Sequence, residues 1–137
     1  MYSTEIKIRV RYGETDRMGY VYYGNYAEYF EVARVEALRS LGLSYKDTED
    51  KGILLPVHTY DIKFLAPAHY DDELLIKTHI IEMPRARIRF RYETLNSEGV
   101  VINIANTALV FIDKESNKPI PAPELFLIKL QPYFQTT

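Results

Sequence analysis

Only one segment of this chain has the pattern of a long helix, and that limits its fold more than any other feature. From Asn25 to Leu41, apolar side chains recur at helical spacing, and Gly42 supplies a stop signal at the end. The apolar-rich segments of strand length that follow are Val57–Leu65, Leu74–Met83, Ala86–Leu95 and Val100–Ile112. Because their connections are short and parallel strands need a long crossover, these strands must be antiparallel neighbours.

The rest of the chain adds one strand before the helix and two short helices after it. Glu5–Tyr12 alternates polar and apolar side chains, which is typical of a half-buried strand. Asn25 is expected to cap the long helix, with Glu28 three residues later as in a capping box. The short helices are expected from Ser44 to about Gly52 and from Pro123, at the first helical position, to Lys129.

A single central helix must bury its apolar face against one curved antiparallel sheet, which predicts a two-layer α+β domain. The chain has 137 residues, which fit one domain, and we expect that domain to span residues 1–137. A chain this short buries a smaller share of its surface than a large one does. A deep ligand pocket is therefore expected to need a second subunit.

The composition argues against several classes of protein. No Cys is present, which removes disulfides, thiolate nucleophiles and zinc–thiolate sites and favours a cytoplasmic location. The N-terminal residues lack the apolar core of a signal peptide, and no stretch is long enough to span a bilayer. The net charge of −2 argues against general binding of nucleic acid.

The loop between the first strand and the long helix carries the most specific motif. Within Val10–Tyr26, two acidic positions flank one residue, and a glycine, an aromatic pair and an Asn-Tyr pair follow. These positions are Glu14 and Asp16, then Gly19, then Tyr22 and Tyr23, then Asn25 and Tyr26. The segment resembles the signature of the 4-hydroxybenzoyl-CoA thioesterase family of hotdog proteins. Tyr29–Arg34, Ile62–Pro67 and Tyr70–Leu74 also resemble the family, so the resemblance covers roughly Ile6 to Ile112.

This resemblance implies the hotdog fold, in which a curved antiparallel sheet wraps a long central helix. It also implies hydrolysis of an acyl-CoA thioester, with the Asp16 carboxylate beside the thioester carbonyl. The backbone N–H of Tyr23 would then donate to the carbonyl oxygen, and Gly19, Tyr22 and Tyr26 would bind the substrate. The resemblance further implies a homodimer that pairs two sheets, or a homotetramer. The reaction needs no cofactor or metal.

Asp16 has two possible roles in such a reaction. Its carboxylate can attack the thioester carbon to form an anhydride, or it can take a proton from an attacking water. An aspartate of ordinary pKa, about 3.9, is a poor base near neutrality, and the sequence leaves both routes open. Thr15-Asp16 alone would suit a simple turn, whereas the surrounding motif favours catalysis. The motif departs from the family at Glu14, usually Asp, and at Gly24, where many relatives carry His or Pro.

Arginines occupy every second position of one predicted strand: Arg85, Arg87, Arg89 and Arg91. On a strand they would share one face at a spacing of about 7 Å. Guanidinium groups suit the phosphates of CoA, and the resemblance puts nucleotide contacts near the start of this strand. We therefore expect Arg85 and Arg87 to bind the substrate. The alternative is a solvated strand face balanced by acids on the neighbouring strand.

Other activities fit the sequence less well. A serine or cysteine hydrolase lacks a Gly-x-Ser-x-Gly elbow and any Cys. A metal-dependent hydrolase would have to use His58, Asp61, His69, Asp71, Asp72 or His79. Of these, His69, Asp71 and Asp72 could be written as a cluster, but they fall in a turn and lack a known zinc spacing. A hotdog dehydratase needs a His base, which the Asp16 loop does not contain. Two alternatives stay open: a protein that binds acyl-CoA without hydrolysing it, and a thioesterase that acts on acyl carrier protein.

Overall fold

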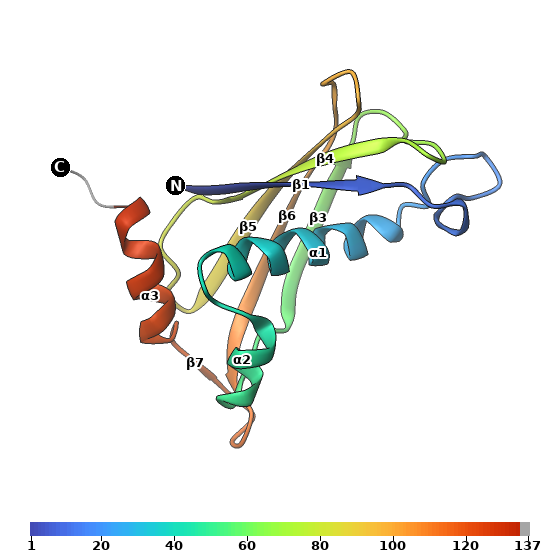
Figure 1. Cartoon of the computed structure of the whole chain (residues 1–137). Coiled ribbons are helices and arrows are strands. Elements are labelled where there is room, and N and C mark those ends of the chain that lie inside the picture. The colour runs from blue at the N-terminus through green and yellow to red at the C-terminus, as the bar shows by residue number, and fades with distance from the viewer. Residues whose placement is uncertain (135–137) are drawn as a thin grey trace.

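The computed structural model describes residues 1–134, in which one long helix lies across one face of an antiparallel sheet (Figure 1). The helices are α1 (Asn25–Ser40), α2 (Tyr45–Asp50) and α3 (Glu124–Leu130), with short 3-10 turns η1 (Tyr12–Glu14) and η2 (Gln131–Tyr133). The strands are β1 (Tyr2–Arg9), β2 (Ile53–Leu54), β3 (Val57–Phe64), β4 (Glu73–Ile80), β5 (Arg87–Leu95), β6 (Val101–Asp113) and β7 (Lys118–Ile120). This confirms the predicted α+β fold. Over this part of the chain, every helix is too short or too polar to cross a membrane.

The long strands are ordered β1-β4-β5-β6-β3, and every neighbouring pair is antiparallel, as predicted. β6 has 13 residues and continues past the ends of β3 and β5. Its last residues pair with two short strands that the sequence did not predict: β2 meets Ile112 and Asp113, and β7 meets Phe111–Asp113. β1 and β3 are therefore the long edges of the sheet.

The apolar face of α1 packs on the inner face of the sheet and forms the centre of the core. Phe30 is fully buried, and its ring stacks on that of Tyr92 in β5 with the ring centroids 4.5 Å apart. Ala33 and Ala37 are also buried, and their small side chains let the helix approach the sheet closely. The helical spacing of apolar residues in the sequence thus identified the buried face correctly.

The two ends of α1 differ in how well the sequence predicted them. Gly42 has a φ of +80°, and the N–H of Leu43 donates to the carbonyl of Leu38 at 2.8 Å, so the helix ends in a Schellman motif. At the other end Gly24 is the capping position, and no side chain among residues 1–134 caps the helix. The predicted cap by Asn25 and its capping box are wrong, because the Asn25 amide donates to a carbonyl of the preceding loop instead.

Two other predicted boundaries are displaced. β1 begins and ends three residues before the predicted strand Glu5–Tyr12, and Tyr12 lies in η1 with its side chain exposed. The polar–apolar alternation continues past the strand end, so the pattern alone could not locate it. Pro123 is the capping residue of α3 and not its first helical residue. In contrast, Ser44 caps α2 as predicted, and accepts from the N–H of Asp47 at 3.0 Å.

β3 differs from the other long strands because nearly all of its residues are exposed. Its exposed apolar side chains are Val57, Tyr60 and Phe64. Within residues 1–134, β6 is the one strand that pairs with it along its length, so the opposite edge of β3 is open. An open, apolar edge strand readily pairs with another chain.

Candidate active site

Asp16 lies at the start of a tight turn between η1 and α1. Its N–H donates to the carbonyl of Tyr20 at 2.8 Å, and the N–H of Gly19 donates to the carbonyl of Asp16 at 3.0 Å. Gly19 has a φ of +82°, which favours glycine at this position. The N–H of Val21 donates to the carbonyl of Ala68 at 2.8 Å, which ties the turn to the connection between β3 and β4. Backbone hydrogen bonds therefore fix the position of Asp16.

The two oxygens of the Asp16 carboxylate have different surroundings. Oδ1 accepts from the N–H of Met18 at 2.9 Å and from the N–H of Tyr20 at 3.2 Å. Oδ2 accepts no hydrogen bond from residues 1–134. One oxygen thus serves the turn, as the simpler interpretation of Thr15-Asp16 proposed, and the other is available to a ligand.

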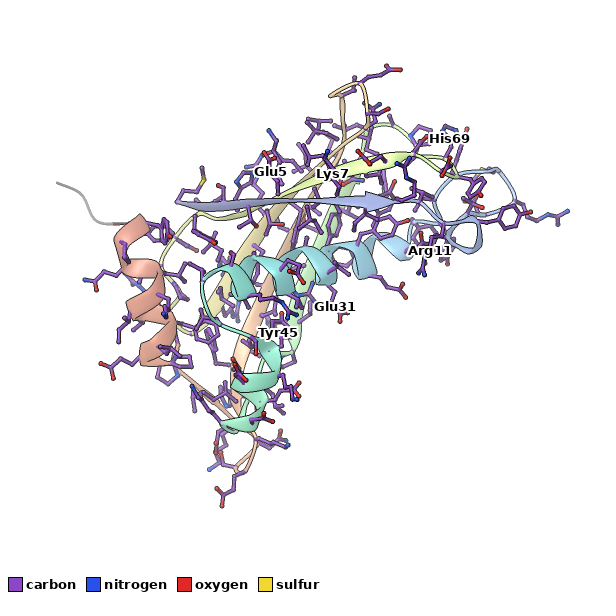
Figure 2. All side chains as sticks on the ribbon, viewed as in Figure 1. Glu5, Lys7, Arg11, Glu31, Tyr45 and His69 are labelled. Atoms are coloured by element: carbon purple, nitrogen blue, oxygen red, sulfur yellow. The ribbon has the colours of Figure 1, made fainter. Side chains whose placement is uncertain are left out.

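Glu14 joins the Asp16 loop to α1. Its buried Oε1 accepts from the N–H of Arg11 at 2.8 Å and from the hydroxyl of Tyr29, on α1, at 2.9 Å. Its main-chain carbonyl accepts from the side-chain amide of Asn25 at 2.7 Å and from the N–H of Tyr22 at 2.8 Å. Arg11 lies beside the N-terminal end of α1 in Figure 2. We call the contacts of Glu14 with Arg11 and Tyr29 the Glu14 clamp.

The charge of the Glu14 clamp follows from these contacts. Burial acts to raise the pKa of the Glu14 carboxyl, but the donors from Arg11 and Tyr29 outweigh it and hold this pKa below its ordinary value. Burial raises the pKa of Tyr29, and its hydrogen bond to Glu14 raises it further. A carboxylate therefore accepts from a neutral phenol near pH 7. In the sequence, Glu14 stands out only as a departure from the family pattern, and nothing there indicates this role.

The entrance of α1 presents free backbone donors next to Asp16. Within the described residues, the N–H groups of Tyr23 and Gly24 donate to no protein acceptor. A Cβ atom at Gly24 would lie 2.7 Å from Cε2 of Tyr22, because the Tyr22 ring covers this position. Tyr22 thus fills the space that the side chain of a larger residue at position 24 would need.

Asp16 opens onto a pocket of about 320 Å³, which we call the Asp16 pocket. Its lining residues are Asp16, Met18, Tyr20, Val21, Tyr23, Tyr26, Phe64, Leu65, Ala66 and Pro67. Of the predicted site residues, the pocket brings together Asp16, Tyr23 and Tyr26. Gly19 shapes the adjoining turn, and Tyr22 lies against Tyr23 with the ring centroids 4.6 Å apart. The sequence did not indicate that the end of β3 would form the opposite wall.

Arg85 and Arg87 lie elsewhere in the fold. They line a different pocket, of about 580 Å³, which is formed by the connection between β4 and β5 and by the start of β5. Thr94 lies on β5 in the part of the sheet beside the Asp16 pocket. Arg87 is seven residues away from Thr94 on the same strand, so the two residues are about 23 Å apart. Arg85 precedes the strand and does not extend its arginine row. Within one chain, the structure does not bring either arginine to Asp16.

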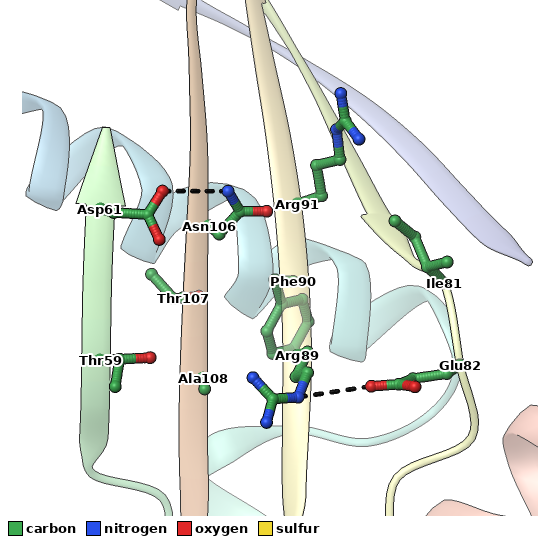
Figure 3. A pocket seen from close by; sticks show the side chains of 10 residues that line it. All are labelled: Thr59, Asp61, Ile81, Glu82, Arg89, Phe90, Arg91, Asn106, Thr107 and Ala108. Carbon is green, nitrogen blue, oxygen red and sulfur yellow. Dashed lines mark hydrogen bonds and ion pairs between the residues drawn. The ribbon is translucent and has the colours of Figure 1, made fainter. Parts of the chain in front are cut away.

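The other two arginines of this strand, Arg89 and Arg91, lie on the outer face of the sheet, away from α1. Figure 3 shows Arg89 and Arg91 over a hollow of about 420 Å³ on this face. Arg89 pairs with Glu82 at 3.3 Å, and Asn106 donates to Asp61 across β6 and β3 at 3.0 Å. The alternative expected acids on the neighbouring strand, whereas Glu82 lies in the connection between β4 and β5.

The structure also contains a Ser–His–Glu series that the sequence did not reveal. Ser3 Oγ lies 2.7 Å from Nδ1 of His79, and Nε2 of His79 lies 2.8 Å from Glu93. These side chains lie on the outer face of β1, β4 and β5, and none of them lines the Asp16 pocket. Ser3 is near the start of β1, whereas the Asp16 loop follows the end of that strand. The series is therefore separate from the candidate site.

His69, one of the candidate metal ligands, belongs to a turn. Its N–H donates to Asp72 Oδ2 at 2.8 Å, and Asp71 has a φ of +69°, which is typical of a turn residue. The His69 ring meets the edge of Tyr20 at a centroid distance of 5.3 Å, outside the Asp16 pocket. Across residues 1–134, no three His, Cys, Asp or Glu side chains are grouped so as to hold a metal ion.

Comparison with known proteins gives a consistent family assignment. Residues 10–130 match the family model described as the thioesterase-like superfamily. YneP of Bacillus subtilis (strain 168), provisionally named an acyl-CoA thioesterase, is 36% identical over 126 residues, which cover 92% of this chain and 91% of YneP.

Solved structures show the same fold. A DHNA-CoA thioesterase from Staphylococcus aureus has a TM-score of 0.85 and 35% identity, and the match covers 98% of this chain and 85% of that one. A variant of 4-hydroxybenzoyl-CoA thioesterase in complex with 4-hydroxybenzoyl-CoA has a TM-score of 0.85 at 23% identity, covering 94% of this chain and 99% of that one. At this identity, the second similarity concerns the fold alone.

Proposed function

Because this chain belongs to the thioesterase-like superfamily, it is a thioester hydrolase of the hotdog fold, and we propose that Asp16 hydrolyses an acyl-CoA. The observation that carries the proposal is the Asp16 carboxylate, which has one oxygen fixed by backbone donors and the other free at a pocket wall. That arrangement holds a reactive oxygen in place without neutralising it by a protein donor. It also lies next to the entrance of α1, where free N–H groups are available.

The reaction can follow either of two routes through Oδ2. As a nucleophile, Oδ2 attacks the carbonyl carbon, the C–S bond breaks, CoA leaves as a thiolate, and water then hydrolyses the resulting anhydride. As a general base, Oδ2 takes a proton from a water molecule that attacks the same carbon. Both routes place negative charge on the carbonyl oxygen. We propose that the N–H of Tyr23 donates to this oxygen, since the entrance of a helix favours negative charge.

We further propose that the protein acts as a homodimer or homotetramer in the cytoplasm. The open edge of β3 ends at Phe64, which also lines the Asp16 pocket, so a second copy that paired there would help to enclose the substrate. Arg85 and Arg87 lie far from Asp16 in their own chain, and we propose that they bind the CoA nucleotide of a substrate held by another subunit. Gly19, Tyr22 and Tyr26 shape or line the acyl end of the site.

Thiol release from short, long and aromatic acyl-CoAs tests the proposed function. Asp16→Asn should lower kcat/KM by at least about 100-fold, as the loss of a general base or nucleophile does. The Asn oxygen can still accept from Met18 and Tyr20, so the turn should keep its shape. Asp50→Asn, at the exposed end of α2, is the matched control and should retain full activity.

The same assay separates the alternatives. If Asp16→Asn keeps more than a tenth of the wild-type kcat/KM, Asp16 is not the reacting group. Wild-type protein that binds an acyl-CoA tightly and releases no thiol would instead be a binding protein. Hydrolysis of an acyl group on acyl carrier protein, with no activity on the same acyl-CoA, would identify the carrier protein as the substrate.

A further inference from the structure

The open edge of β3 presents backbone groups at alternate residues. The N–H of Leu65 donates to the carbonyl of Ile102 at 2.8 Å, which continues the register of the β3–β6 pair. Along an antiparallel strand, residues bonded to one neighbour alternate with residues whose N–H and C=O point the other way. The backbone groups of Tyr60, Ile62 and Phe64 therefore point away from β6. Within residues 1–134 no strand pairs with them on that side, so they are available to a strand of another chain.

The side chains of β3 favour one register for pairing with a second copy of the chain. A symmetric antiparallel pair places one residue on the two-fold axis, opposite its own copy. Only with Ile62 on this axis does β3 set opposite charges against each other, because Asp61 then lies opposite Lys63 of the partner subunit. In the same register Tyr60 lies opposite Phe64 of the partner subunit, and both rings lie on the face that α1 covers. With Asp61 or Lys63 on the axis, two like charges would meet instead.

His58 occupies a β-bulge near the start of β3. Val57 lies opposite Leu109 of β6, and Thr59 lies opposite the residue before Leu109, so His58 is the extra residue between them. Thr59 lies on the outer face of the sheet in Figure 3, and successive side chains of a strand point to opposite faces. The exposed His58 side chain therefore lies on the inner face, which α1 covers. Bulges often re-aim a side chain next to an active site.

Pairing in this register brings His58 of the partner subunit to the wall of the Asp16 pocket. It places His58 opposite Ala66, and Phe64–Pro67 forms one wall of the pocket. The N–H of Ala66 donates to the carbonyl of Ile102 at 3.1 Å, so this residue stays beside β6. Residues directly opposite on paired strands have Cβ atoms about 5 Å apart. Among residues 1–134, the lining of the pocket contains one carboxylate and no imidazole, so the partner subunit would add a group that a single chain lacks there.

We propose that His58 of the partner subunit is the general base at the Asp16 pocket. This role rests on the proposed function and on the dimer proposed with it. A carboxyl group of ordinary pKa is a poor base near neutrality, whereas a neutral imidazole readily accepts a proton there. Asp16 is then the nucleophile, and His58 acts after CoA has left. The oxygen of a water molecule bonds to the acyl carbon of the anhydride, and one of its protons passes to His58. The bond from that carbon to Oδ2 of Asp16 breaks, which releases the acid and restores the carboxylate, and His58 returns its proton to solvent.

Mixed dimers test whether His58 acts across the subunit boundary. Asp16→Asn and His58→Gln should each lower the kcat of thiol release by about 100-fold or more, with a smaller change in KM. Co-expression of the two variants with different affinity tags allows mixed dimers to be isolated. Each mixed dimer has one complete site and one site with both substitutions, so it should have about half of the wild-type kcat. Thr59→Val, at the neighbouring residue on the outer face, is the control and should keep full activity.

Two results of these assays would overturn the role of His58. The first is a mixed dimer no more active than the separate variants, because His58 would then act within its own chain. The second is a loss of activity in Asp16→Asn without a loss in His58→Gln, which would leave the proposed function intact. Full activity in Asp16→Asn would instead overturn the proposed function itself.

Cross-linking tests the register without any turnover of substrate. The chain has no Cys, so an introduced thiol is unique. Ile62→Cys places two thiols opposite each other on the axis, where the Cα atoms are about 5.5 Å apart and a disulfide can form. Oxidation should therefore join most Ile62→Cys chains into covalent dimers, seen on a non-reducing gel. Asp61→Cys, whose copies lie diagonally across the axis, should cross-link much less. Failure of Ile62→Cys to cross-link would overturn the register and, with it, the role of His58.

Discussion

Tyr29→Phe tests whether the Glu14 clamp holds the Asp16 loop on α1. The substitution removes a 2.9 Å hydrogen bond from a buried phenol to a carboxylate. Bonds to charged groups contribute about 1.5–3 kcal/mol. Because the N–H of Arg11 still donates to the same oxygen at 2.8 Å, we expect a loss of stability of about 1.5 kcal/mol. For a domain of this size, that loss corresponds to a fall in Tm of about 5 °C.

The clamp should also affect the reaction, because Glu14 joins the residues on both sides of Asp16. If Tyr29→Phe lets the loop move, kcat should fall by about tenfold, which corresponds to about 1.4 kcal/mol of transition-state stabilisation. KM should change much less, since Tyr29 does not line the Asp16 pocket. The assay is thiol release with the substrate that the wild type prefers, together with thermal unfolding. Tyr12→Phe, which removes an exposed hydroxyl next to Glu14, is the control for both.

The pH dependence of stability gives an independent test of the same contacts. The pKa of Glu14 in the folded protein is below its ordinary value of 4.5, so its contribution is complete above that pH and is lost as the pH falls through the folded pKa. Wild-type Tm should therefore fall more steeply below about pH 4.5 than the Tm of Glu14→Gln does. A Tyr29→Phe variant with reduced Tm and unchanged kcat would show that the clamp stabilises the fold without positioning Asp16.

Two further predictions concern the helix entrance and the sheet edge. Gly24→Ala should destabilise the protein by up to about 1 kcal/mol, because the new Cβ displaces the Tyr22 ring. In a Tyr22→Ala background, where this ring is absent, the same substitution should be neutral or stabilising. A double-mutant cycle of unfolding free energies that shows simple additivity would contradict this steric reason. Val57→Lys should weaken association through the open edge of β3, because edge lysines prevent strand pairing. Light scattering should then give a molar mass that is closer to that of a single chain, 16.0 kDa, than the wild-type mass is. An unchanged mass would place the interface elsewhere.

The sequence predicted those parts of the fold that depend on repeated local patterns. The helical period from Asn25 to Leu41 located α1 within one residue, and the four segments after it matched β3 to β6 within three residues at each end. The end of β1 was missed because alternation continued into η1. β2 and β7 have only two and three residues, too few to show a period, and they form because β6 extends beyond its long partners.

The site was predicted less completely, because most of its contacts join residues far apart in the sequence. The motif identified Asp16, Tyr23 and Tyr26, which the structure brings to one pocket. No local pattern could show that Glu14 bonds to a residue fifteen positions later.

Under the roles proposed for Asp16 and for the arginines, one chain alone could not bind the whole of a substrate as large as an acyl-CoA. The Asp16 pocket lies at the end of the sheet where α1 begins. Arg87 and its neighbours lie on the outer face at the opposite end of β5. A substrate that reached both within one chain would have to pass around the sheet. In a symmetric dimer each chain can supply the acyl site for one substrate and the arginines for another, and the exposed edge of β3 is the surface on which such a pairing would form.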